Sequence, residues 1–149
     1  MSILDKNVDL IGAITATAFY VSAIMVFLSR LGGKRHIEYW LGIFEISLSI
    51  PIIYLLFAAI RADRPVLYFI QLGMMLLWLV VELLLDYIFK IDFRKIRWMV
   101  ICYVILFFGA AGGMIGIASN AGRGWSIASI ILFLIMAVLA FVQRKITGM

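Results

Sequence analysis

Five apolar segments occupy almost the whole chain, and each is close to the ~20 residues that a helix needs to cross the hydrocarbon core of a bilayer. They run over residues 10–29, 39–60, 66–89, 98–119 and 125–143. The connections between them are short and polar, so consecutive helices are expected to be antiparallel neighbours. The pattern predicts an all-α integral membrane protein, with one bundle of five transmembrane helices over residues 1–149.

The composition makes lipid the expected solvent. Hydrophobic residues make up 66% of the 149 residues and charged residues only 14%, against about 45–50% and about 25% in soluble domains. A chain of this length has too small a core to bury so much apolar surface. We therefore expect a multi-pass protein of the plasma (cell) membrane, without the compact basic module that binds nucleic acid.

The basic residues divide unevenly between the two ends of the predicted bundle. Nine of the 13 fall at one end, namely Arg30, Lys34, Arg35, Lys90, Arg94, Lys95, Arg97, Arg144 and Lys145. The other four are Lys6, Arg61, Arg64 and Arg123. Because Lys and Arg concentrate on the cytoplasmic side, we predict an outside N-terminus and a cytoplasmic C-terminus. The basic end is expected to contact anionic lipid headgroups.

Three acidic residues, Glu45, Glu82 and Asp86, stand inside these apolar segments. A carboxylate in hydrocarbon costs at least roughly 2.5–3.5 kcal/mol on insertion scales, which favours a functional role. With a rise of about 1.5 Å per residue, Glu45 and Glu82 should each lie ~10 Å inside the cytoplasmic face. They stand on adjacent antiparallel helices, so we predict that they form a pair.

Polar positions repeat at helical spacing around both carboxylates. On the third helix they are Gln71, Met75, Trp78, Glu82 and Asp86, and on the second they are Glu38, Gly42, Glu45 and Ser49. If the two faces meet, they form a polar seam that opens toward the cytoplasm. Tyr20, Ser22 and Tyr103 are expected at similar depth as hydrogen-bond donors to the carboxyl groups.

A pair of carboxyl groups in a low-dielectric medium resists double ionisation. Such a pair can share a proton, bind a cation or receive a cationic ligand. Asp86 is expected to pair instead with Lys90, four residues further along the helix, and Glu38 to be solvated at the interface. No cofactor or metal site is predicted, because His36 and Cys102 are the only residues of their kinds.

Three functions remain open at this point. The first is binding or transport of a proton, a cation or a small cationic or amphipathic ligand at the carboxylate site. The second is acid–base catalysis on a lipid or isoprenoid, although HExxH and Ser–His–Asp motifs are missing and no catalytic residue can be assigned. The third is a non-catalytic subunit whose acidic residues pair with a basic partner helix.

Two further features concern helix packing. Gly109 with Gly113, and Gly112 with Gly116, form overlapping GxxxG patterns, which let helix backbones approach closely in lipid. We expect them to pack inside the bundle, with a homodimer face as the alternative. Pro51 lies inside the second segment, where it removes a hydrogen bond to the Ser47 carbonyl and is expected to kink the helix.

Overall fold

The computed structural model describes residues 3–90 and 95–147. Its helices are α1 (Ile3–Leu31), α2 (Arg35–Ser47), α3 (Ser49–Arg61), α4 (Val66–Glu82), the π-helix η1 (Leu83–Ile88), α5 (Arg97–Ser119) and α6 (Arg123–Thr147). Since α3 follows α2 after one residue and η1 continues α4, these described residues form five helices that are long and apolar enough to cross a membrane. The prediction of an all-α chain with five such helices is confirmed.

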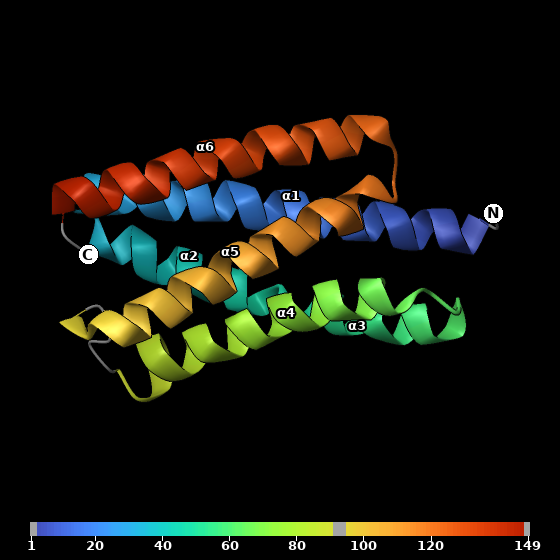
Figure 1. Ribbon diagram of the computed structural model, residues 1–149, viewed down its shortest axis with the longest axis horizontal. Helices are drawn as coiled ribbons and strands as arrows, with labels where there is room; N and C mark the ends of the chain where they lie inside the picture. The colour runs from blue at the N-terminus through green and yellow to red at the C-terminus, as the bar shows by residue number, and fades with distance from the viewer. Residues whose placement is uncertain (1–2, 91–94, 148–149) are drawn as a thin grey trace.

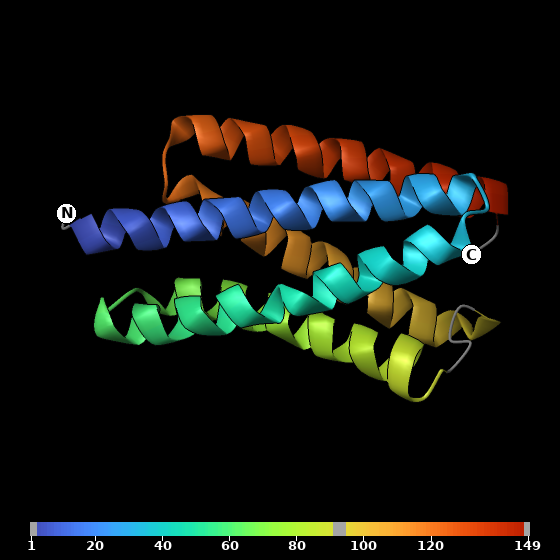
Figure 2. The ribbon, with the colours of Figure 1, turned by 180° about the vertical axis from the view of Figure 1, so that it is seen from behind.

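Helix α1 lies at the centre of the bundle, where it contacts α2, α3, α5 and α6, while α4 packs between α3 and α5 (Figures 1 and 2). One end of the bundle holds the α1–α2 turn, the end of η1, the start of α5 and the end of α6. We call it the basic end because most of the Lys and Arg residues fall there. The opposite end holds the start of α1 and the α3–α4 and α5–α6 turns.

Aromatic rings fill the middle of the bundle. Phe19 of α1, Trp78 of α4 and Phe107 of α5 contact one another with ring centroids 5.2–6.1 Å apart. Trp78 is only 2% exposed, whereas Trp40 and Trp98, near the basic end, are more than half exposed. Trp78 therefore packs against protein, as its position far from any helix end predicts.

The glycines of α5 pack against α4. A Cβ atom added at Gly113 would lie 3.4 Å from the Cα atom of Gln71, and one at Gly109 would lie 3.0 Å from the Met74 side chain. At Gly116 the added Cβ would meet the amide nitrogen of Gln71 at 2.1 Å. Gly112, in contrast, has nothing within 4 Å of its added Cβ. Gly109, Gly113 and Gly116 thus allow close α4–α5 contact inside the bundle.

A buried ion pair ties α1 to the α3–α4 turn at the end opposite the basic end. Arg64 Nη2 lies 2.8 Å from Asp9 Oδ1, and the Asp9 side chain is 3% exposed. The same guanidinium stands over the Tyr68 ring, 5.2 Å from its centroid. The ion pair thus joins the start of α1 to the turn that leads into α4, which lies more than 50 residues further along the chain.

Candidate functional site

Glu45 lies just before the point where the second membrane-spanning segment is interrupted, between α2 and α3. The Pro51 ring clashes with the carbonyl group four residues earlier, that of Ser47, and proline offers no N–H to bond it. Helix α2 accordingly ends at Ser47, and the Leu48 N–H turns back to the Glu45 carbonyl at 3.0 Å. Glu45 is 4% exposed and accepts a hydrogen bond of 3.1 Å from the Ser22 hydroxyl of α1. The predicted bend thus lies directly after this carboxylate.

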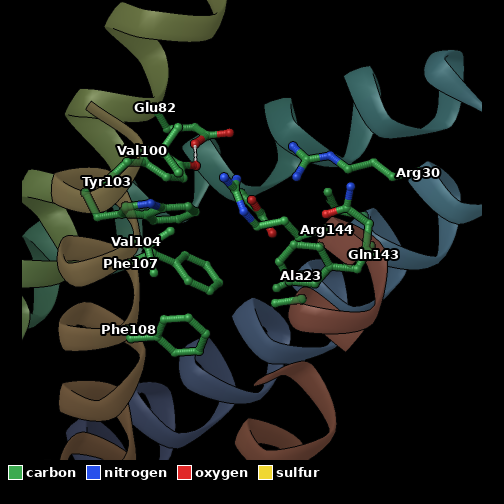
Figure 3. Close-up of a pocket in the computed structure, with 15 residues that line it drawn as sticks. Ala23, Arg30, Glu82, Val100, Tyr103, Val104, Phe107, Phe108, Gln143 and Arg144 are labelled. Atoms are coloured by element: carbon green, nitrogen blue, oxygen red, sulfur yellow. Dashed lines mark hydrogen bonds between the residues drawn. The ribbon is translucent and has the colours of Figure 1, made fainter. Parts of the chain in front are cut away.

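Glu82 is the last residue of α4 and is 6% exposed. The Tyr103 hydroxyl of α5 donates a hydrogen bond to Glu82 Oε2 (Figure 3). Directly after Glu82 the backbone changes to a π-helix, in which the Phe89 N–H bonds the Leu84 carbonyl at 2.8 Å. A π-helical segment is rare and frequently occurs at functional sites.

The π-helix changes which side chains accompany Glu82. In an α-helix of 3.6 residues per turn, a residue five positions along faces away from the first. With the i to i+5 repeat of η1, both Asp86 and Tyr87 line the same cavity as Glu82. The Tyr87 hydroxyl then reaches α2, where it donates to the Tyr39 carbonyl at 2.9 Å. Gly42 makes room for it, because an added Cβ there would lie 2.0 Å from the Tyr87 oxygen.

The helical spacing that predicted an Asp86–Lys90 pair does not apply. The helix ends at Ile88, and Lys90 adopts a left-handed backbone conformation with φ of 51°. Lys90 is therefore not on a common helix face with Asp86. Glu38 was expected to be solvated, but it is only 26% exposed and pairs with Arg30 at 2.6 Å.

Two cavities meet at the carboxylates. The first, of about 100 Å³, lies between α1, α4, α5 and α6, and the second, of about 280 Å³, lies between α1, α2 and the α4–η1 junction. Both are lined by Val26, Arg30, Glu45 and Glu82. Glu45 and Glu82 therefore lie at the junction of the two cavities, together with the positive charge of Arg30.

The first cavity is mainly aromatic and aliphatic. Figure 3 shows Arg30, Gln143 and Arg144 reaching in from one side and Glu82 and Tyr103 from the other, with Phe107 and Phe108 beyond them. Trp78 also lines this cavity, and its indole nitrogen has no hydrogen-bond partner in the described part of the chain. The second cavity is strongly charged, with Glu38, Glu45, Glu82 and Asp86 against Arg30 and Arg35.

Three residues expected at the site lie elsewhere. Neither cavity described here is lined by Gln71 or Ser49. Gln71 lies on the α4–α5 contact at Gly113 and Gly116, and Ser49 begins α3, beyond the break that follows Glu45. Tyr20 donates its hydrogen bond to the Ala111 carbonyl of α5 rather than to a carboxylate. The rotation of the helices placed Gln71 and Tyr20, and sequence spacing does not fix the rotation of one helix relative to another. The break after α2 placed Ser49.

Arg30 is a residue of the site that the sequence does not predict. The sequence places it among the basic residues at one end of the bundle, but its side chain is only 12% exposed and lines both cavities. The sequence does contain an indication that Arg30 faces the site, because Ser22, Val26 and Arg30 follow one another at four-residue steps and share a face of α1. Tyr87, Gln143 and Arg144 were also not predicted.

Within residues 3–90 and 95–147, no group of three His, Cys, Asp or Glu side chains is placed to hold a metal ion. Ca²⁺ requires six to eight oxygen ligands, and Mg²⁺ near-octahedral geometry. Aromatic rings beside carboxylates instead attract organic ammonium groups.

Comparison of the chain with protein-family models, with curated proteins and with solved structures yields no match.

Proposed function

We propose that this protein is a small membrane carrier or binding protein for an organic cation, with Glu45 and Glu82 as the residues that bind the positive charge. The observation that carries the proposal is that these two buried carboxyl groups, from different helices, line the same two cavities. A cation between them neutralises charge that is costly to hold in a low-dielectric interior. A proton takes the same place when the cation leaves.

A purely structural role explains the carboxylates less well. Hydrogen bonds between membrane helices contribute about 0.6 kcal/mol on average, whereas a central carboxylate costs at least roughly 2.5 kcal/mol to insert. The second cavity also carries four acidic residues against two arginines, one of which is already paired with Glu38. This excess of negative charge favours a cationic ligand.

The proposed orientation follows the positive-inside rule. With the basic end in the cytoplasm, both cavities lie near the cytoplasmic face, because Arg30, Arg35 and Arg144 line them. The ligand would then exchange with the inner side of the membrane. Anionic headgroups at the same end would gather cations near the opening.

Thermal unfolding of the purified protein with n-butylammonium or tetramethylammonium tests the proposal, because a ligand that binds only the folded state raises its stability. We expect a concentration-dependent rise in Tm for the wild type and none for Glu45→Gln or Glu82→Gln. Asp63→Asn is the matched control, since Asp63 is an exposed acid at the opposite end. A wild type that no ammonium ion stabilises, or equal stabilisation of all variants, would overturn the proposal.

A further inference from the structure

The aromatic cavity is not fully enclosed, and residues of both α5 and α6 line it. These two helices are joined by a short turn at the end opposite the basic end, and they diverge toward the basic end in both views (Figures 1 and 2). Val100 and Val104 of α5 and Ala140 and Arg144 of α6 line the cavity. The neighbouring Ile101 and Ile105, 49% and 67% exposed, face outward. The outer face of α5 next to the cavity is therefore a surface that lipid would cover.

Stacked aromatic rings join α5 and α6 beside this cavity. Phe108 of α5 lines the cavity and stacks on Phe141 of α6, with ring centroids 6.0 Å apart and planes 12° apart. Phe141 is itself 66% exposed. Phe133 packs edge-on against Phe108. Ala140, next to Phe141 in the sequence, is a small α6 residue that lines the cavity.

The two cavities differ in polarity on either side of the carboxylates. On the α5 side the lining is mainly aromatic and aliphatic over the nine residues from Val100 to Phe108, about 12 Å of helix, while Gln143 and Arg144 of α6 line the same cavity. On the α2–η1 side the lining is charged. A molecule with its ammonium group at Glu45 and Glu82 would therefore have an apolar surface for one end and a polar space for the other.

We propose that the natural ligand is a single-chain amphipathic amine that enters from the bilayer between α5 and α6. Its amine binds Glu45 and Glu82, and its alkyl chain passes between α5 and α6, beside Ala140. This inference rests on the proposed function, because it assumes that the carboxylates bind the positive charge. It adds the class of ligand and its route.

Photo-crosslinking tests the route. The full chain is reconstituted in phosphatidylcholine vesicles with hexadecylamine that carries a diazirine near the middle of its chain, and the labelled residues are mapped by mass spectrometry. We expect labelling at Val104, Phe108 and Ala140, and its loss in the Glu45→Gln/Glu82→Gln double variant. Ala140→Trp should strongly reduce it, because the larger side chain would occupy the space that the alkyl chain crosses. Val138→Trp, at a 61% exposed position of α6, should leave it unchanged.

The outcomes separate the two proposals. Labelling that persists in the double variant reports surrounding lipid and overturns the route. If n-butylammonium stabilises the wild type but these residues are not labelled, the proposed cation site stands and the proposed amphipathic ligand is wrong. If neither amine binds the wild type, both proposals are wrong. The label positions in the wild type decide the route even if Ala140→Trp does not fold.

Discussion

At the residue scale, the two central carboxyl groups are each held by a hydroxyl group from a neighbouring helix. Ser22 donates to Glu45, and Tyr103 donates to Glu82. A buried polar group that loses its partner carries the full desolvation penalty, about 1–3 kcal/mol and more when it is charged. The donors thus fix the carboxylates in place beside the cavities. Arg30 adds a positive charge at the same junction but is itself paired with Glu38.

Two tyrosines of the site allow a matched comparison. Tyr103→Phe removes the donor to a buried carboxyl group and should lower the free energy of unfolding by about 1–3 kcal/mol. Tyr87→Phe removes a donor to a backbone carbonyl, and should cost only the ~0.6 kcal/mol typical of membrane hydrogen bonds. Reversible unfolding in mixed micelles measures both. Equal losses of stability in the two variants would show that the Tyr103–Glu82 hydrogen bond contributes no more than the Tyr87–Tyr39 one.

At the scale of helices, both carboxylates lie next to an irregularity in the backbone. Helix α2 ends two residues after Glu45, and the π-helix begins one residue after Glu82. Such departures from α-helix are tolerated in a membrane where neighbours satisfy the freed backbone groups. A separate hydrogen bond, from Tyr87 of η1 to the Tyr39 carbonyl of α2, joins the π-helix to α2 across the second cavity.

Packing of α4 on α5 leads to a prediction about the glycines. Gly113→Leu should destabilise the bundle by about 1–3 kcal/mol, the usual cost of overpacking, because its Cβ atom meets the α4 backbone at Gln71. Gly112→Leu should be tolerated, since no atom lies within 4 Å of an added Cβ. Thermal unfolding in detergent compares the two.

The Gly112 variant also tests the alternative of a homodimer. If Gly112 formed the centre of a GxxxG dimer contact, Gly112→Leu would shift the protein to monomers in size-exclusion chromatography with light scattering. An unchanged oligomeric state with a destabilised Gly113→Leu variant is the result expected from packing within the bundle.

At the scale of the whole molecule, charged contacts lie at both ends of the bundle. The carboxylate cavities lie toward the basic end, and the buried Asp9–Arg64 pair lies at the other. The aromatic contacts of Phe19, Trp78 and Phe107 fill the space between them. Charged side chains therefore lie toward both ends of the bundle, and apolar side chains fill its middle.

The uneven distribution of basic residues predicts the orientation of the whole chain. An alkaline phosphatase fusion should be active at the N-terminus and inactive at the C-terminus, whereas a green fluorescent protein fusion at the C-terminus should fluoresce in the cytoplasm. The reason is the excess of Lys and Arg at the basic end. Reversed reporter activities would place the cavities near the outer face and contradict the proposed cytoplasmic exchange.

The sequence by itself determined the five helices and the positions of the two glutamates along them. In lipid every backbone polar group must be satisfied within the chain, so an apolar segment of about 20 residues has essentially one solution, the helix. The fixed rise per residue then sets how far Glu45 and Glu82 stand from the ends of their helices. The Pro51 interruption was predictable for the same local reason, because the ring excludes one specific hydrogen bond.

The tertiary structure alone decided which side chains surround those glutamates. Lipid tails are as apolar as a protein core, so hydropathy does not reveal how each membrane helix is rotated toward its neighbours. Tyr20 and Gln71 consequently turned to α5, while Arg30 turned into the site. The π-helix after Glu82 and the divergence of α5 from α6 depend on contacts between distant segments. They shape the two cavities on which the proposed ligand and its route rest.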